Sequence, residues 1–478
     1  MFLINWGEIE ERLEPNYHKK EHRDLESAVL KLSKHKLRDF ILYIAGGATP
    51  KTTESEKYYS DKRNGVAFVR VQNLSPAGLR LDDLKYINSE THGGMLARSQ
   101  VREGDLLTKI TGVGRMAVSS VAPMGFKGNI NQHMVVIRTK NEETSKILAA
   151  FLNSDIGEKL ASRRSTGGTR PALDYAALRS IPVILNEDIV KIMDAAYEEK
   201  REKERQAKEL LDGINSYLLD ELGIAMPPVE ENTLENRIFF VNASKVLGSR
   251  FDPRKYTIKY QKIFNAIEDS KFDTKRLREV VSNDVSGNWG LDETEVDDGL
   301  LTCLTIRATE FDNKFNLNLE NNRVKYRKYK PEIYEKVALS SNEILIEKSG
   351  GSDNQPVGRV ALIEKQMVES NNLAYSNFIH KIIIKQDIAY PEYIFEYLRL
   401  MHNVKVTEVM QTQTNGIRNL IMREYFGQTV ILPDKATQKR IAIEASKMRT
   451  YAKNLESIAD DIVKKAKAHV EKILLEGN

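Results

Sequence analysis

The sequence predicts an α+β protein in which two similar mixed domains are separated by two long helices. Short motifs recur at a nearly constant spacing. Arg-Leu-Glu-Pro at residues 12–15 returns as Arg-Phe-Asp-Pro at 250–253, an offset of 238 (250 − 12). Thr-Gly-Gly-Thr-Arg at 166–170 returns as Thr-Asn-Gly-Ile-Arg at 414–418, an offset of 248 (414 − 166). Each copy is followed by a long, charged, amphipathic segment, so we predict a duplicated domain that suits the recognition of two different targets.

Hydrophobic periodicity predicts the same order of elements in both copies. In the first copy we expect a helix over residues 24–40, strands over 66–71, 106–110, 116–121 and 134–138, a helix over 144–160 and a closing segment over 178–185. In the second copy we expect helices over 258–268 and 274–281, strands over 301–308, 344–347, 357–364 and 379–384, a helix over 391–400 and a strand over 428–432.

Two long helices are expected, over residues 187–222 and from 436 to the C-terminus. Their apolar residues recur with a spacing that is typical of a coiled coil. Gly223 and the prolines at 227–228 end the first helix. The expected domains are residues 1–186 and 225–433, and the expected helical segments are 187–224 and 434–478. The residues expected at the coiled-coil interface are Met193, Ala196, Ala207, Leu210, Ile214, Tyr217, Ile441, Met448, Leu455 and Ile462.

Two interpretations of these helices remain open. Each helix can pack on the core of its own domain, whereas their equivalent places in a duplicated chain favour pairing with each other. If a pseudo-twofold axis relates the domains, that pairing is antiparallel. A helix of about 35 residues is on the order of 50 Å long, at roughly 1.5 Å per residue. It would then hold the two domains apart.

The composition indicates a mildly basic globular protein. The hydrophobic fraction is 41%, the charged fraction is 29% and the net charge is +4, which permits a nucleic-acid partner without requiring one. Cys303 is the sole cysteine, so an intrachain disulfide is excluded and a reducing, cytoplasmic setting is expected. No apolar run approaches the roughly 18 residues of a membrane span. Residues 1–6 lack the basic leader of a signal peptide.

Catalytic motifs are few. The sequence contains no P-loop, no dinucleotide-binding glycine motif, no Gly-x-Ser-x-Gly elbow and no Asn/Asp-Pro-Pro-Tyr/Phe run of amino-methyltransferases, and we expect no cofactor. His18, Glu21 and His22 fit the His-x-x-Glu-His pattern of zinc hydrolases. At the repeat offset the two histidines become Tyr256 and Tyr260. That replacement favours a bulky ring over a metal ligand, so zinc hydrolysis is the less favoured hypothesis.

Loops rich in Gly, Ser, Thr, Asn, Gln and Arg interrupt both copies, and they predict contacts with nucleic acid. Arg and Lys contact phosphate or guanine, and Asn and Gln can pair with adenine. Hairpin loops have a similar composition for turn reasons alone, but the matching Thr-x-Gly-x-Arg loops favour a binding role. The DNA-binding candidates are Lys109, Thr111, Arg115, Asn131, Gln132, Arg163, Arg164, Thr166, Thr169, Arg170, Lys348, Ser349, Ser352, Asn354, Gln355, Gln413, Thr414, Asn415 and Arg418. The first candidates among them are Arg163, Arg164, Arg170 and Arg418.

Taken together, these features resemble the specificity (S) subunit of type I restriction-modification enzymes. The resemblance covers nearly the whole chain, and the order and repetition of the motifs are more specific than any single motif. It is carried by Gly-Gly-Ala-Thr-Pro at 46–50, Gly-Asp-Leu-Leu at 104–107 with Thr-Gly at 111–112, Asn-Gln at 131–132, Gly-Gly-Thr-Arg at 167–170 and the segment 210–224.

The resemblance implies that each copy is a target-recognition domain that reads one half of a bipartite sequence in double-stranded DNA. It also implies an antiparallel coiled coil that docks two adenine-methyltransferase (M) subunits, with restriction/translocase (R) subunits as further partners and no catalysis by this chain. The second copy departs from the pattern, with Gly-Asn-Trp at 287–289 and Tyr-Ser-Asn at 375–377. That departure fits divergence toward a different half-site. A specificity-like subunit of another phage-defence system and a scaffold that binds protein are the remaining alternatives.

Overall fold

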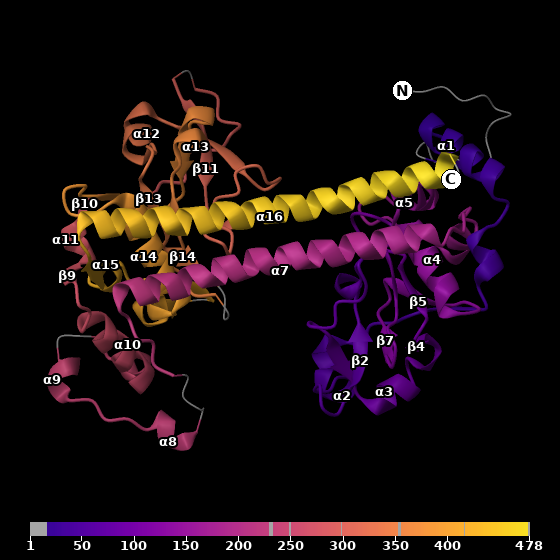
Figure 1. Ribbon diagram of the computed structural model, residues 1–478, viewed down its shortest axis with the longest axis horizontal. Coiled ribbons are helices and arrows are strands. Elements are labelled where there is room, and N and C mark those ends of the chain that lie inside the picture. Colours follow the sequence, from indigo (N-terminus) through magenta and orange to yellow (C-terminus); the bar gives the residue numbers. More distant parts are fainter. Residues whose placement is uncertain are drawn as a thin grey trace. The chain divides into compact units, whose positions relative to one another are not determined.

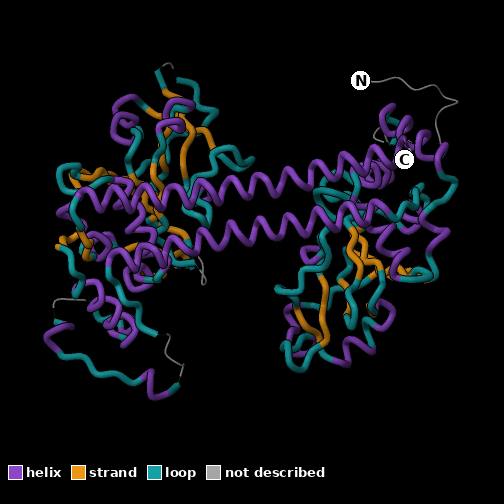
Figure 2. Tube along the Cα trace, in the orientation of Figure 1, coloured by secondary structure: helices purple, strands orange, loops and turns teal. Residues whose placement is uncertain are grey.

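The structure is a computed structural model that describes residues 17–228, 233–247, 250–297, 299–351, 355–414 and 416–476. It divides into two compact units, shown as a ribbon in Figure 1 and by secondary structure in Figure 2. Unit 1 is Met1–Arg205 together with Leu455–Asn478, and unit 2 is Gln206–Asn454. The division cuts through both long helices, so each unit contains a part of each. The repeat at residues 12–15 lies outside the described residues.

Unit 1 contains two four-stranded sheets. The first has the order β1 (Tyr43–Gly46), β8 (Met134–Arg138), β5 (Leu106–Lys109) and β6 (Ser119–Val121), with every neighbouring pair antiparallel. The second has the order β3 (Lys85–Ile87), β2 (Val66–Val69), β7 (Gly128–Ile130) and β4 (Gln100–Val101), in which only β2 and β7 are parallel.

The helices of unit 1 surround these sheets. They are α1 (Lys20–Leu32), α2 (Ser55–Tyr58), α3 (Ser89–Gly93), α4 (Glu142–Asn153), α5 (Asp155–Arg164) and α6 (Tyr175–Arg179). Leu148 and Phe151 on α4 share a buried core with Val135 and Ile137 on β8. The predicted helix over 144–160 is two helices, because Ser154 accepts the backbone N–H of Gly157 at 3.0 Å and caps α5.

Unit 2 repeats the two sheets and adds two small ones. The first has the order β10 (Val281–Ser286), β17 (Ile379–Ile384), β13 (Ile344–Glu347) and β15 (Val360–Leu362), all antiparallel. The second is β12 (Lys325–Tyr329), β11 (Leu301–Ile306) and β16 (Leu373–Tyr375). The small sheets are β14 (Ser349–Gly350), β19 (Ile417–Leu420) and β18 (Gln411–Thr414), and the pair β20 (Thr429–Leu432) and β9 (Asp273–Arg276).

The remaining helices of unit 2 lie along the chain between these strands. They are α8 (Leu234–Arg237), α9 (Ala243–Val246), α10 (Ile258–Glu268), α11 (Leu277–Val280), α12 (Pro331–Val337), α13 (Lys365–Ser370), α14 (Pro391–Asn403) and α15 (Met422–Phe426).

The predicted duplication is confirmed, because strand order and register match between the units. Leu106 pairs with Val121 and Ile137, and at equivalent places Ile344 pairs with Leu362 and Ile382. The offset is 238 for the central strand (344 − 106), 241 for one neighbour (362 − 121) and 245 for the other (382 − 137). The parallel pair of the second sheet also recurs, as β2–β7 and β11–β16. The extra residues of the second copy therefore enter in several loops.

The two long helices are confirmed, and they pair antiparallel within each unit. They are α7 (Asp188–Leu222) and α16 (Lys435–Glu476). In unit 1 Lys200 Nζ lies 2.5 Å from Asp460, and in unit 2 Arg440 pairs with Glu221 at 2.6 Å. Later residues of α7 thus face earlier residues of α16 (Figure 1). Met448 approaches Gly213 so closely that a Cβ there would lie 3.3 Å from the methionine methyl group.

The two interpretations of these helices turn out to be compatible. Ile214, Leu218 and Ile441 belong to the core of unit 2, and Met193 and Val470 belong to the core of unit 1. Of the ten residues expected at the interface, Leu210, Tyr217, Met448 and Ile462 are half-buried and the other six are buried. The alternating large and small residues therefore serve both helix pairing and domain packing.

One predicted helix is wrong, and several strands were missed. Residues 274–281 form the end of β9, the short helix α11 and the start of β10, because β9 pairs with β20 and β10 pairs with β17. Their apolar spacing does not distinguish a helix from two short strands. The strands β1, β3 and β7 have only three or four residues each, too few to show a period.

Candidate nucleic-acid interface

In unit 1, two of the predicted loops lie against each other. The backbones of Thr111 and Thr166 both bridge to Ala172, and Gly112 donates its N–H to the carbonyl of Pro171 at 3.0 Å. Gly167 has φ +93°, a conformation that favours glycine. Thr169 and Arg170 are exposed at the tip of this turn, whereas Thr111 and Thr166 are half-buried. The structure thus presents Thr169 and Arg170 to solvent.

Lys109 and Arg115 hold the first loop in place. Lys109 Nζ donates to the carbonyls of Val113 at 2.7 Å and Arg115 at 3.0 Å. Arg115 in turn pairs with Asp155 on α5 at 2.6 Å. Burial lowers the pKa of the Lys109 ammonium. Both cations are therefore engaged by the protein, and they position the loop between them.

The structure argues against DNA contact by Arg163 and Arg164, two of the first candidates. Both lie at the end of α5, both are at least 95% buried, and both pair with Glu26 on α1. Arg163 also donates to the Tyr17 carbonyl at 2.8 Å and lies 4.2 Å from the Tyr17 ring. Guanidinium groups held inside unit 1 cannot reach a duplex without unpairing Glu26. They fasten α1 to α5 and are withdrawn as DNA contacts.

The two residues of the Asn-Gln pair in the first copy, Asn131 and Gln132, face in opposite directions. Asn131 is buried, and its Oδ1 accepts the N–H of His133 at 3.3 Å. Gln132 is exposed. Gly47 lies beneath this turn, where a Cβ would come within 2.0 Å of the Ile130 carbonyl oxygen. A Cβ at Gly287 would likewise lie 2.1 Å from the carbonyl oxygen of Ser376. Both copies thus use glycine to bring two backbone segments together, although the polar residues above differ.

The corresponding loops of unit 2 form a small sheet. Strand β19 pairs with β14 on one side and β18 on the other. Ser349 is buried and its hydroxyl lies 2.7 Å from Asn419 Oδ1, while Gln355 donates to Asn313 at 2.7 Å. Gln413 is exposed and Arg418 is half-exposed. Ser352, Asn354 and Asn415 lie outside the described residues, as does the side chain of Thr414.

Lys348 directly follows β13, whereas Lys109 is the last residue of β5, so the two lysines lie one position apart in the repeat. The Lys348 ammonium donates to Ser286 Oγ at 2.9 Å. Burial lowers its pKa, as it does for Lys109. Both copies therefore keep a partly buried lysine at the base of the candidate loops.

Asn419 and strand β12 were not among the predicted residues and elements. Asn419 carries no signal of its own, because only the pairing of β14 with β19 brings it to Ser349. Strand β12 does carry one: Lys, Tyr, Arg, Lys, Tyr and Lys follow one another at residues 325–330. Cations interleaved with aromatic rings are a pattern of nucleic-acid binding.

Each unit also contains a groove at the corner between its domain and the long helix that follows that domain. Groove 1 has a volume of about 310 Å³ and groove 2 about 730 Å³. Both are lined by equivalent residues. The pairs at an offset of 249 are Val190 and Lys439, Met193 and Ala442, Asp194 and Ile443, and Tyr197 and Ser446. Further pairs are Ala77 and Phe315, and Val121 and Leu362.

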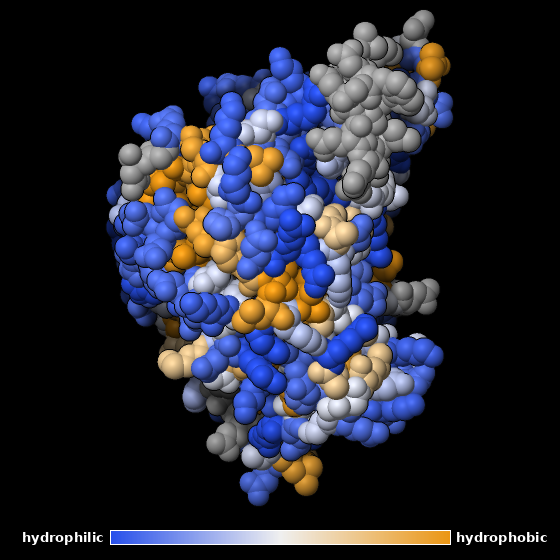
Figure 3. Space-filling view, turned by 90° about the vertical axis from the view of Figure 1, so that its right-hand side faces the viewer, coloured by the Kyte–Doolittle hydropathy of each residue, from blue (hydrophilic) through white to orange (hydrophobic). Residues whose placement is uncertain are grey.

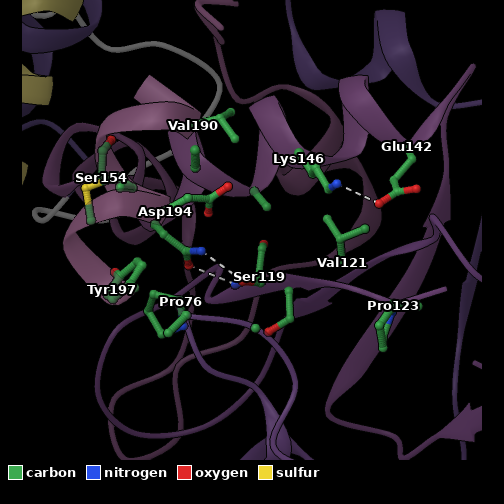
Figure 4. A pocket seen from close by; sticks show the side chains of 18 of the residues that line it. Pro76, Ser119, Val121, Pro123, Glu142, Lys146, Ser154, Val190, Asp194 and Tyr197 are labelled. Atoms are coloured by element: carbon green, nitrogen blue, oxygen red, sulfur yellow. Dashed lines mark hydrogen bonds and ion pairs between the residues drawn. The ribbon is translucent and has the colours of Figure 1, made fainter. Parts of the chain in front are cut away.

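Groove 1 combines an apolar floor with a charged rim. Figure 4 shows Lys146 and Glu142, which pair at 2.7 Å. Burial raises the pKa of Asp194, raises that of Tyr197 to about 12 and lowers that of Lys467. Met124 on the rim is 90% exposed. Figure 3 shows that apolar side chains also gather in clusters on one otherwise largely hydrophilic face.

The zinc-like pattern does not have its expected geometry. Helix α1 begins at Lys20, so His18 precedes it and the two imidazoles do not share a helix face. His18 is buried with its ring edge-on to Tyr17, and His22 lies 4.0 Å from Glu21. Within the described ranges, no group of three or more His, Cys, Asp and Glu side chains is placed to hold a metal ion.

Among the helices that the structure describes, none combines the length and apolar character needed to cross a membrane.

No protein-family model and no curated protein matches the sequence. Several solved structures are similar in fold. One comes from work on complex assembly and conformational transition of a type I R-M system, with 15% identity, 92% of this chain and 96% of that chain covered, and a TM-score of 0.46. The HsdS subunit from Thermoanaerobacter tengcongensis has 14% identity, 93% and 96% coverage, and a TM-score of 0.34.

The S subunit of a type I restriction-modification system from M. genitalium has 12% identity, 90% and 95% coverage, and a TM-score of 0.38. This chain is thus similar to each of these three chains along at least nine tenths of its length.

Proposed function

We propose that this chain is the non-catalytic DNA-recognition subunit of a type I restriction-modification complex. The observation that carries the proposal is the duplicated framework with unlike exposed loops. The first sheet repeats strand for strand and three strands of the second recur, whereas the turn that bears Thr169 and Arg170 in unit 1 corresponds to the β18–β19 hairpin with Gln413 and Arg418 in unit 2. Two domains that share a scaffold and differ in their exposed polar residues suit two different half-sites.

Each domain reads bases through its exposed loop residues. Arg170 and Arg418 can make paired hydrogen bonds to guanine, and Gln132 and Gln413 can do so to adenine. The paired helices set the distance between half-sites, of order one turn of B-DNA, roughly 34–36 Å, or somewhat more. The M subunits methylate adenine after flipping it from the duplex, and R subunits act as further partners.

Replacing Arg170 by alanine is expected to weaken binding of the complex to its target by about 1–3 kcal/mol and to relax sequence preference at one half-site. The reason is that the exposed guanidinium sits at the tip of the turn. Binding is measured on duplexes with each half-site randomised in turn. Arg38→Ala, which removes an exposed arginine outside the interface, serves as control. Equal effects of the two variants, or an effect on both half-sites, would contradict the assignment.

The two M subunits dock in groove 1 and groove 2, one in each. Residues at equivalent positions line both grooves, so two copies of one partner can meet the same elements of the fold in each unit, although the side chains differ. An apolar centre with a charged rim is the usual anatomy of such an interface. Met124 and Ile443 are the exposed apolar side chains at the two sites, at 90% and 46%.

Met124→Glu and Ile443→Glu are each expected to reduce the number of bound M subunits from two to one, and the double variant to bind none. A carboxylate placed against an apolar contact costs on the order of 2 kcal/mol or more. Native mass spectrometry of the purified complex measures the stoichiometry. Leu42→Glu and Leu247→Glu change exposed apolar residues away from the grooves and are expected to leave two M subunits bound. Unaltered stoichiometry in the double groove variant would rule out this docking mode.

The same complex distinguishes the alternatives. Sequence-specific, salt-dependent DNA binding together with the M subunits excludes a protein-binding scaffold. Mapping methylated adenines in host DNA separates a type I target, with two unlike half-sites and a fixed gap, from the target of a differently organised phage-defence system.

A further inference from the structure

Strand β12 carries a dense set of cations at the edge of a sheet. It pairs only with β11 within the three-stranded sheet β12-β11-β16. Lys325, Tyr326 and Lys330 are exposed, and Arg327 and Lys328 are half-buried. Lysine on an edge strand also guards against pairing with other chains. Protection against pairing needs only a few scattered charges, so it does not explain so many cations on one short strand.

An acidic loop covers the middle of the strand, at Arg327 and Lys328. Four carboxylates occur in the six residues of this loop from 292 to 297. Leu291 exchanges both backbone hydrogen bonds with Lys328, Arg327 pairs with Asp292 at 2.8 Å, and the Lys328 ammonium donates to the Glu295 carbonyl. Hydrogen bonds from the N–H and hydroxyl of Thr294, together with Arg327, hold the pKa of Asp292 below its usual range. The loop therefore stays negatively charged at neutral pH.

The first copy has the strand without the acidic cover. Lys85 and Tyr86 on the edge strand β3 correspond to Lys325 and Tyr326 at an offset of 240 (325 − 85). The loop before β2, residues 47–65, carries four cations and three carboxylates, whereas residues 287–300 before β11 carry five carboxylates and no cation. The shared fold thus forms with either loop, and the acidic loop is particular to the second domain.

The covered strand adjoins the candidate interface of unit 2. Lys348, at the base of the candidate loops, donates to Ser286 at 2.9 Å. Three residues further along the chain, the carbonyl of Trp289 accepts from Arg327 Nε at 3.3 Å, and the Trp289 ring lies 4.9 Å from that guanidinium. Three residues of extended chain span at most roughly 10 Å. The part of β12 at Arg327 therefore lies close to Lys348 and the candidate loops.

We propose that β12 contacts the DNA backbone in the second domain, and that the acidic loop at residues 291–297 is its intramolecular competitor, displaced by phosphate when target DNA binds. This inference rests on the proposed function. It adds a contact with the DNA backbone, and a competitor that regulates this contact, to the recognition loops. Carboxylates and phosphates compete for the same guanidinium and ammonium groups. The competition penalises weak, non-specific binding most, because such binding draws on phosphate contacts alone.

The test uses the assembled complex and two duplexes, one with the methylated target sequence and one scrambled. Asp292→Asn/Glu293→Gln/Glu295→Gln is expected to bind the scrambled duplex about ten-fold more tightly. Its plot of log K against log salt concentration should steepen by about 0.9, the value for one added phosphate contact. Lys325→Gln/Lys330→Gln is expected to make the slope shallower by about 1.8 on both duplexes. Glu335→Gln/Glu369→Gln/Asp387→Asn removes three exposed carboxylates of the same unit and is the matched control.

The outcomes separate this inference from the proposed function. The inference is overturned if the loop variant behaves as the matched control does, or if the lysine variant leaves the salt slope unchanged. Specific binding by the parent complex would still uphold the proposed function in either case. Lysine variants that lose an M subunit and keep the DNA slope assign β12 to a protein partner and also overturn the inference. A parent complex without sequence preference overturns the proposed function itself.

Discussion

Replacing Glu26 by alanine is expected to lower the free energy of unfolding of unit 1 by about 3–5 kcal/mol. Glu26 is the carboxylate that pairs with both Arg163 and Arg164, and the two guanidinium groups are almost wholly inside the protein. Removing it leaves two buried positive charges next to each other, which is far more costly than losing an exposed ion pair. Urea titration followed by circular dichroism measures the shift in midpoint.

A matched control lies five residues away on the same helix. Glu21 is 72% exposed beside His22, so Glu21→Ala is expected to change stability by no more than about 0.5 kcal/mol. Glu26→Gln/Arg163→Met/Arg164→Met, which removes all three charges together, is expected to recover much of the loss. Equal midpoints for Glu21→Ala and Glu26→Ala would show that the arginines are not held by Glu26. They would then return as candidates for DNA contact.

Gly47→Ala and Gly287→Ala are expected to destabilise their own units by about 3 kcal/mol or more. A Cβ at Gly47 would lie 2.0 Å from the Ile130 carbonyl oxygen, and one at Gly287 would lie 2.1 Å from that of Ser376. Both obstacles are backbone atoms, which cannot swing aside as a side chain can. Limited proteolysis with mass spectrometry identifies which unit opens in each variant.

Gly93→Ala is the control for both, because a Cβ there meets nothing within 4 Å. Its proteolysis pattern is expected to match that of the parent protein. If Gly287→Ala is tolerated while Gly47→Ala is not, the two copies do not share this crossing. The structural equivalence that supports two recognition domains would then be weakened at that position.

The long helices were predictable in detail because their signal is local. The apolar stripe of α7 and of α16 repeats over many turns, and Gly223 ends the first helix. The repeat could likewise be read from Thr-x-Gly-x-Arg motifs at a nearly fixed spacing. Short strands such as β1 and β7 could not, because three or four residues carry no measurable period, and their pairing depends on partners far along the chain.

The sequence predicted which loops form the candidate interface, but it did not predict which of their residues are exposed. The loops at 111–115, 166–172 and 411–420 do come together in their units. Composition could not separate Arg170, which is exposed, from Arg163 and Arg164, which pair with Glu26 about 140 residues away (164 − 26 = 138). All three have the same chemistry, and only the position of α1 decides which of them reach solvent.

The sequence by itself determined the duplication, the mixed α+β class and the two long helices, because each is a pattern repeated along the chain. Tertiary structure decided which polar residues face outward, that equivalent grooves flank both domains, and that an acidic loop covers the basic strand β12. These depend on pairs such as Glu26 with Arg164 and Asp292 with Arg327. Pairing and burial act between residues distant in sequence, so no local pattern encodes them.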